Sequence, residues 1–273
     1  MSEPFRGPVS RDAIVERIEA HPLGDTPPDM RNRFAALALG DGPGAAPSTG
    51  VPSEKGAILY LHGGGYVFGS PATHRRIVEG LRERTGWTVV APRYPLAPEH
   101  GWPAQLDAAL SAVPAGRVVL AGDSAGGHLA LVAALELARR KAPVDGLVLF
   151  SPNTDRSGLS ETRERNDPLD PMVDDEGDRE LAKLCFGKMA PEHPHVSPVL
   201  DDLSLLPPTH VEVGAQEVLL GDSVILAERA RAAGRAVTLH IEPQGLHMGQ
   251  LWTPWWDVAN ASLHRAAAFL RDL

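Results

Sequence analysis

The fold is decided by the stretch Val118-Val119-Leu120-Ala121-Gly122-Asp123-Ser124-Ala125-Gly126-Gly127-His128-Leu129-Ala130-Leu131. Its first four residues form an apolar run typical of a buried strand, and its last residues follow a helical pattern. Between them, Gly122 and Gly126 allow a sharp turn without Cβ clashes, so the hydroxyl of Ser124 projects at the start of a helix. This strand, turn and helix context predicts that Ser124 is a nucleophile.

The bare Gly-x-Ser-x-Gly pattern is weak on its own. With the glycine and serine content of this chain, it arises by chance in about one such sequence in eight. A serine in a glycine turn can also simply cap the helix that follows it, and the pattern at Ser124 leaves that alternative open.

A glycine loop follows the end of another predicted strand, in His62-Gly63-Gly64-Gly65-Tyr66. Three consecutive glycines leave backbone N–H groups unobstructed, which is what a tetrahedral oxyanion needs. The alternatives are a flexible loop or a phosphate loop, but the segment lacks both a Lys-Ser/Thr pair and Gly-x-Gly-x-x-Gly, which disfavours a nucleotide. A His-Gly-Gly-Gly run occurs by chance on the order of one per cent, so the two motifs together are a strong signal.

Short apolar runs alternate with helical patterns from Ala57 onward. The alternation is typical of a mainly parallel central sheet with helices on both faces, so the sequence predicts an α/β fold. The predicted strands are 58–61, 88–91, 118–121, 147–150, 210–213 and 237–241, and the predicted helices lie near 72–84, 103–113, 124–140, 222–233 and 256–271.

Two segments depart from this alternation. Residues 1–50 contain a helix capped by Ser10, then Pro-rich turns, the region of the first strand and a loop at 40–50. Residues 155–200 are dense in charged residues and proline, with one short helix expected around 176–186. We interpret both as a small lid on a catalytic domain of residues 51–273; the alternative is a solvated excursion with no role at the site.

Composition excludes several classes of protein. A net charge of -9 provides no basic field for nucleic acid. Cys185 is the single cysteine, which excludes an intrachain disulfide, and its apolar neighbours indicate a packed thiol. The N-terminus has no signal-peptide core and no run of about 18 apolar residues occurs, so we expect a cytoplasmic protein that does not bind membranes.

Four stretches together resemble the hormone-sensitive-lipase-like family of esterases, also called bacterial family IV, of the α/β-hydrolase fold. They are His62-Gly63-Gly64-Gly65, residues 94–100, residues 122–127 and the C-terminal acid and histidine segments, and they span roughly residues 55–270. Pro95 stands where the family's tyrosine motif usually has arginine, which we interpret as variation in a supporting loop. The resemblance implies a serine esterase for small-molecule carboxylic esters with short to medium acyl chains, with no metal or organic cofactor.

The resemblance also implies roles for the glycine loop. By position, Gly64, Gly65 and the backbone N–H of Ala125 would form the oxyanion hole. Gly63 would be the hinge of the loop, and His62 would support it without acting as a base.

Among eleven histidines, position favours His247 as the general base. It follows the last predicted strand, where a side chain can lean over the carboxyl end of the sheet toward the serine. His128, on the helix behind the serine, and His240, within a strand, are interpreted as structural. The His193-x-His195 pair has no third ligand at a telling spacing, so we expect no metal site.

The triad acid is expected after the strand at 210–213, because triads on this fold run in the order serine, acid, histidine. Glu217 fits this position. Many family members have Asp-Pro-Leu where this chain has Glu217-Val218-Leu219, which resembles the branch that uses glutamate. Asp222 is the alternative acid, although we interpret it as the N-cap of the next helix. Gln216 cannot orient an imidazolium by charge.

These residues predict hydrolysis through an acyl-enzyme, with Ser124 attacking, His247 moving the proton and Glu217 holding the imidazole. An amidase, a lactonase or a thioesterase would use the same triad. A small-molecule binding protein on the same scaffold is a rival of another class, which the retained His247 disfavours. The strand edge at 237–241 permits a homodimer.

Overall fold

The computed structural model describes residues 3–40, 47, 53–142 and 144–273, and a six-stranded sheet lies at its centre. All of the strand pairs run parallel, in the order β2-β1-β3-β4-β5-β6, so the carboxyl ends of the strands share one edge. The prediction of a parallel sheet is confirmed. The strands are β1 (Ala57–Leu61), β2 (Thr88–Val90), β3 (Val118–Asp123), β4 (Gly146–Phe150), β5 (Thr209–Gly214) and β6 (Val237–Glu242).

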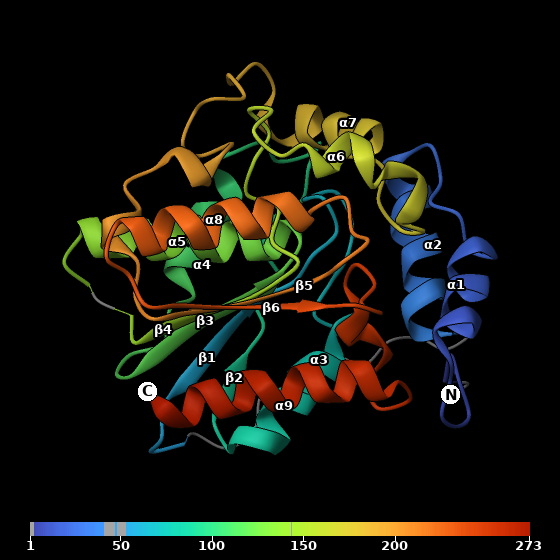
Figure 1. Ribbon diagram of the computed structural model, residues 1–273, viewed down its shortest axis with the longest axis horizontal. Helices are drawn as coiled ribbons and strands as arrows, with labels where there is room; N and C mark the ends of the chain where they lie inside the picture. The colour runs from blue at the N-terminus through green and yellow to red at the C-terminus, as the bar shows by residue number, and fades with distance from the viewer. Residues whose placement is uncertain (1–2, 41–46, 48–52, 143) are drawn as a thin grey trace.

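Helices cover both faces of this sheet (Figure 1). On one face lie α3 (Arg75–Thr85) and α9 (Asp257–Asp272), and on the other lie α4 (Ala104–Ser111), α5 (Ala125–Arg139) and α8 (Leu220–Ala232). The central strands are buried from both sides, which explains why their sequences are continuously apolar instead of alternating. The predicted helices are confirmed with shifts of a few residues at their ends.

The N-terminal segment forms two helices. The first, α1 (Arg11–Glu19), begins after Ser10, whose hydroxyl accepts a hydrogen bond from the N–H of Ala13, as predicted. The Pro-rich stretch that follows was predicted as turns, and this was wrong: it forms α2 (Pro27–Leu39), with Thr26 as N-cap. Proline is compatible with the first turn of a helix, because the N–H that it lacks would have no helical partner there. Residues 3–40 contain no strand, and most of the predicted loop at 40–50 lies outside the described residues.

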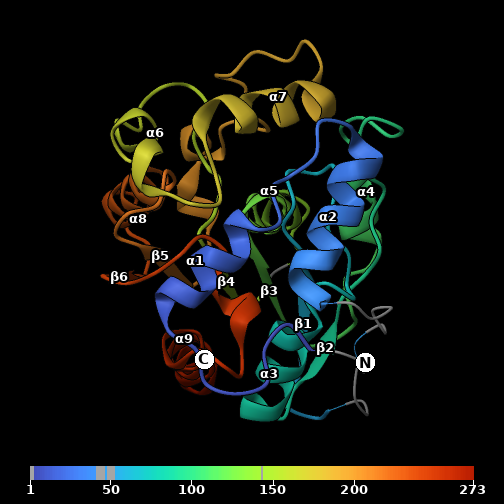
Figure 2. The same ribbon diagram turned by 90° about the vertical axis from the view of Figure 1, so that its right-hand side faces the viewer.

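The segment between β4 and β5, which includes the insertion, carries α6 (Thr162–Arg165), α7 (Asp175–Phe186) and the short 3-10 helices Asp167–Leu169, Pro198–Leu200 and Leu203–Leu205. The helix predicted around 176–186 is confirmed as α7. Figure 2 shows α1 and α2 in front of the carboxyl ends of the strands, with α7 beside them. Within the described ranges, no helix has both the length and the apolar character to cross a membrane.

Buried ion pairs hold the insertion together and fasten it to α8. The guanidinium of Arg163 contacts Asp222 at 2.9 Å and Asp178 at 3.0 Å, and all three side chains are buried. One oxygen of Asp222 also accepts hydrogen bonds from the N–H groups of Thr154 and Asp155, at 2.9 and 2.8 Å. The prediction that Asp222 caps α8 was therefore wrong: it lies in the first turn of that helix and its carboxylate serves the insertion.

Candidate active site

Ser124 lies in the tight turn between β3 and α5, with a left-handed backbone φ of 52°. At two glycines of this turn, the neighbouring backbone lies too close to leave room for a side chain. A Cβ on Gly126 would lie 2.1 Å from the carbonyl oxygen of Leu61, and one on Gly122 would lie 2.4 Å from the carbonyl oxygen of Gly126. The side chain of Ser124 makes no capping bond to α5, so the helix-cap alternative does not hold.

Three predicted residues meet at the carboxyl edge of the sheet. Nε2 of His247 lies 2.9 Å from Oγ of Ser124, and Nδ1 of His247 lies 3.0 Å from Oε2 of Glu217. Ser124 follows β3, Glu217 follows β5 and His247 follows β6, so parallel strands bring them together. All three side chains are buried. The arrangement is a continuous chain of hydrogen bonds from hydroxyl to carboxylate.

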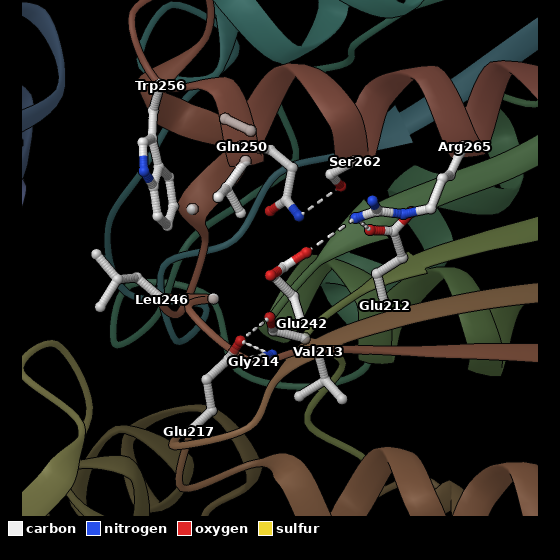
Figure 3. Close-up of a pocket in the computed structure, with 15 residues that line it drawn as sticks. Glu212, Val213, Gly214, Glu217, Glu242, Leu246, Gln250, Trp256, Ser262 and Arg265 are labelled. Atoms are coloured by element: carbon white, nitrogen blue, oxygen red, sulfur yellow. Dashed lines mark hydrogen bonds and ion pairs between the residues drawn. The ribbon is translucent and has the colours of Figure 1, made fainter. Parts of the chain in front are cut away.

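The carboxylate of Glu217 is held by a further pair of donors (Figure 3). Its Oε1 accepts hydrogen bonds from the hydroxyl of Ser151, at 2.9 Å, and from the N–H of Gly214. Behind it lies a cavity of about 20 Å³, bordered on its far side by the ion pair of Arg265 with Glu212. Sequence reasoning missed Ser151, although a polar residue directly after a strand next to the nucleophile strand is a usable signal.

Glu217 also sets the basicity of His247. Burial lowers the pKa of the imidazole, but the hydrogen bond and the charge of Glu217, together with the charges of Asp170 and Asp123, outweigh burial, so the pKa of His247 is raised. Burial and the charge of Glu217 in turn raise the pKa of Asp170 to about 6. Sequence reasoning did not single out Asp170, which lies in the insertion.

The glycine loop lies beside Ser124. Gly64 and Gly65 have φ values of 115° and 57°, a region that favours glycine. A Cβ on Gly64 would lie 2.4 Å from the carbonyl oxygen of Phe68, so the loop has no room for a side chain there. Both glycines border the same cavity as Ser124 and His247.

His62 lies beneath this loop, where its ring stacks on Tyr94 with centroids 4.3 Å apart. The hydroxyl of Tyr94 donates to the carbonyl oxygen of His62 at 2.6 Å. Burial, and then the neighbouring His74, lower the pKa of His62 to about 3, so its ring is neutral at physiological pH. These contacts fit a supporting residue.

Asp123, which sequence reasoning left without a role, connects the loop to β3. It is fully buried and accepts hydrogen bonds from the hydroxyl of Tyr60, at 2.5 Å, and from the N–H of Gly63, at 3.1 Å. Nε2 of His74 lies 3.1 Å from its other oxygen. Its position directly before Ser124 could have suggested such a role.

A cavity of about 750 Å³ opens above the serine. Its walls come from α1, the loop after α1, α2, and residues 171–184. Among the described residues that line it, the charged side chains are all carboxylates, with no lysine or arginine. The apolar members of the wall are Ile18, Leu23, Met30, Phe34, Leu37, Phe68, Met172, Val173, Leu181, Leu184, Leu219 and Met248, and the carboxylates are Glu19, Asp25, Asp174, Asp178 and Glu180.

The side chains of the remaining candidates from the sequence make their contacts away from Ser124, Glu217 and His247. His128 contacts Tyr66, and His240 contacts Glu242 at 3.3 Å. Burial raises the pKa of the Cys185 thiol to about 12, which fits a packed, unreactive side chain. Of the His193-x-His195 pair, His195 accepts a hydrogen bond from Trp102. The residues that the structure describes contain no cluster of three or more metal-binding side chains.

Comparison with known proteins agrees with this geometry. Residues 58–251 match the model of a protein family that is described as having the alpha/beta hydrolase fold. The chain belongs to the alpha/beta hydrolase family. This hydrolase is 35% identical over 225 residues to an acetyl-hydrolase of Streptomyces hygroscopicus, covering 78% of this chain and 75% of that protein. It is 33% identical over 226 residues to an esterase of Acinetobacter venetianus, covering 79% and 75%.

Solved structures of similar proteins belong to a narrower group within this family. An esterase from the bacterial hormone-sensitive lipase family superimposes with a TM-score of 0.88 at 31% identity, covering 96% of this chain and 97% of that one. A hormone-sensitive lipase from a metagenome library superimposes with a TM-score of 0.87 at 28% identity, covering 98% and 99%. The resemblance to the hormone-sensitive-lipase-like family that the motifs indicated is confirmed.

Proposed function

We propose that this hydrolase is a serine carboxylesterase that cleaves small uncharged esters through an acyl-enzyme. The observation that carries the proposal is the chain of contacts from Ser124 through His247 to Glu217, at 2.9 and 3.0 Å, with its serine end on a large cavity. The relatives named acetyl-hydrolase and esterase support ester hydrolysis as the reaction.

In the first half of the reaction, Oγ of Ser124 attacks the ester carbonyl while Nε2 of His247 takes the hydroxyl proton. The carbonyl oxygen becomes an oxyanion, which the N–H groups of Gly64, Gly65 and Ala125 bind. The tetrahedral intermediate collapses, His247 gives the proton to the alkoxide, and the alcohol leaves.

In the second half, water takes the place of the alcohol. His247 removes a proton from the water as it attacks the acyl-enzyme, and then returns the proton to Oγ of Ser124 as the carboxylic acid is released. Glu217 stays ionised throughout. It holds Nδ1 of the imidazole protonated and stabilises the imidazolium that forms twice in each cycle.

The cavity supports the choice of substrate. Its apolar walls favour an apolar acyl chain, for which the family resemblance implies short to medium length, and its carboxylates disfavour an anionic ester by charge repulsion. Because α1, α2 and the insertion supply most of these walls, we assign them to a lid over a catalytic domain of residues 51–273.

A homodimer is a further part of the proposal. β6 is an edge strand of the sheet, and Ile241 on it is 41% exposed. An unpaired strand edge is a template for pairing with a second copy. Sedimentation of the wild-type protein and of an Ile241→Lys variant tests it: we expect a dimer that the charge disrupts, and a wild-type monomer would refute it.

A panel of p-nitrophenyl esters with increasing acyl length, run with the wild type and Ser124→Ala, tests the activity. We expect rapid hydrolysis of the shorter esters and a loss of several orders of magnitude in the variant. Ser111→Ala is the matched control, because it removes an exposed hydroxyl at the end of α4 that bonds only locally. Near-normal turnover in Ser124→Ala refutes the mechanism, and faster cleavage of matched amides or lactones refutes the ester as substrate.

A further inference from the structure

Two side-chain hydrogen bonds hold the glycine loop, residues 63–65, against the segment that carries the nucleophile. At the start of the loop, the N–H of Gly63 donates to Asp123 at 3.1 Å. At its end, the hydroxyl of Tyr66 lies 2.6 Å from Nδ1 of His128, in the first turn of α5. The side chains of Asp123, Tyr66 and His128 are fully buried.

The contact between Tyr66 and His128 has little freedom to shift. The backbone of Tyr66 has φ 66°, which few residues other than glycine adopt. Its ring meets His128 edge-on at 5.7 Å, and it makes similar edge contacts with Trp102 at 5.9 Å and Phe186 at 5.7 Å. Its carbonyl oxygen also accepts a hydrogen bond from the N–H of Ala97. Packing and hydrogen bonds therefore fix the ring from several sides.

This contact matters because the oxyanion hole of the proposed function has two halves. Gly64 and Gly65 belong to the loop, directly before Tyr66, whereas Ala125 belongs to α5, three residues before His128. Donors from separate segments bind one oxyanion well only when their separation is held to within about 0.5 Å.

We propose that Tyr66 and His128 form a strut that sets the separation of the two halves of the oxyanion hole. Both are positioning residues, since neither borders the substrate cavity. This inference rests on the proposed function. The strut is expected to strengthen binding of the transition state, and this effect is separate from any effect on folding.

Three variants probe the strut. Tyr66→Phe removes one hydroxyl and keeps the ring, and His128→Leu removes the ring nitrogens. His128→Asn retains an amide near the position of Nδ1, so it can still bond to the Tyr66 hydroxyl. Thr85→Val is the matched control, because it removes another buried hydroxyl, which donates to Leu81 at 2.7 Å at the end of α3.

We expect kcat for p-nitrophenyl butyrate to fall by about 10- to 100-fold in Tyr66→Phe and His128→Leu, with KM changed by less than about threefold, because a misplaced oxyanion donor loses part of its effect. The affinity for a trifluoromethyl ketone, which forms an oxyanion adduct with the serine, should fall by the same factor as kcat. His128→Asn should recover most of kcat. The double variant Tyr66→Phe/His128→Leu should be no worse than either single change.

The strut is refuted if the single variants keep wild-type kcat, if their losses multiply in the double variant, or if affinity for the ketone stays unchanged while kcat falls. An equal loss in Thr85→Val also refutes it, because the effect would then be general destabilisation. Failure of the proposed function gives a result that can be distinguished from failure of the strut. In that case the wild-type protein would hydrolyse no ester, and neither would the variants at positions 66 and 128.

Discussion

Replacing Glu217 by glutamine is expected to reverse the hydrogen bonding of the imidazole. In the wild type, Oε1 of Glu217 accepts from Gly214 and Ser151, and Oε2 faces Nδ1 of His247 at 3.0 Å. The N–H of Gly214 can only donate, so the amide oxygen of the new side chain must remain there. The amide NH2 group then faces Nδ1, which must accept, and the proton of the neutral ring moves to Nε2. That nitrogen can no longer take the proton of Ser124.

The magnitude follows from two losses that act together. The imidazole adopts the wrong tautomer, and the charge that stabilises the imidazolium disappears. The matching acid-to-amide change in another serine triad lowers kcat by about 10⁴-fold, which is about 5.4 kcal/mol of activation free energy at 1.36 kcal/mol per factor of ten. For Glu217→Gln we expect a loss of about 10³- to 10⁴-fold in kcat, with KM changed by less than about threefold, because the interaction is made in the transition state.

The assay is steady-state hydrolysis of p-nitrophenyl butyrate, with the thermal midpoint of each variant recorded to show that it is folded. Glu217→Asp keeps the charge on a shorter side chain and should retain more activity than Glu217→Gln. Asp222→Asn is the control, because that carboxylate contacts Arg163 and not the imidazole. Asp222→Asn should lower the free energy of unfolding by about 3 kcal/mol, because it breaks a buried ion pair. Its effect on the activation free energy of the reaction should be smaller. If Glu217→Gln keeps more than about a tenth of kcat, or if Asp222→Asn loses as much as Glu217→Gln, then Glu217 is not the triad acid.

Three further outcomes are expected. Because the pKa of His247 is raised and the base must be neutral, kcat/KM should increase with pH and reach half of its plateau above about pH 6.5; a flat profile from about pH 6 to 8 would contradict a histidine base. Gly126→Ala places a Cβ 2.1 Å from Leu61 and should lower the free energy of unfolding by about 1–3 kcal/mol, measured in urea; an unchanged midpoint would show that the turn relaxes. Met172→Trp fills part of the cavity wall and should lower kcat/KM for decanoate relative to acetate by about tenfold, whereas an unchanged ratio would place the acyl chain elsewhere.

Much of the fold and the meeting of three polar side chains at one edge of the sheet could be predicted, because both follow from local patterns. Apolar runs and helical patterns gave the strand and helix order, and a parallel sheet brings the ends of its strands to one edge. Ser124, Glu217 and His247 each follow a strand, so their order along the chain was enough to place them together.

What the sequence could not predict depends on contacts between distant segments. Pro27 and Pro28 resemble helix breakers in the sequence, but they occupy the first turn of α2, where proline is tolerated. Asp222 resembles a helix cap, but its oxygens are taken by Arg163 and by two backbone N–H groups of the insertion. Ser151 directly follows a strand, which is a usable signal, but no local pattern marks Glu217, after the neighbouring strand, as its partner.

The most direct test of the nucleophile is covalent labelling. The wild-type chain, Ser124→Ala and His247→Ala would each react with a fluorophosphonate, and the labelled peptide would be identified by mass spectrometry. The triad predicts one label per wild-type chain, on Ser124, with labelling abolished in the first variant and strongly slowed in the second. A label on any other residue, or no label on a wild-type protein that hydrolyses esters, would contradict Ser124 as the nucleophile.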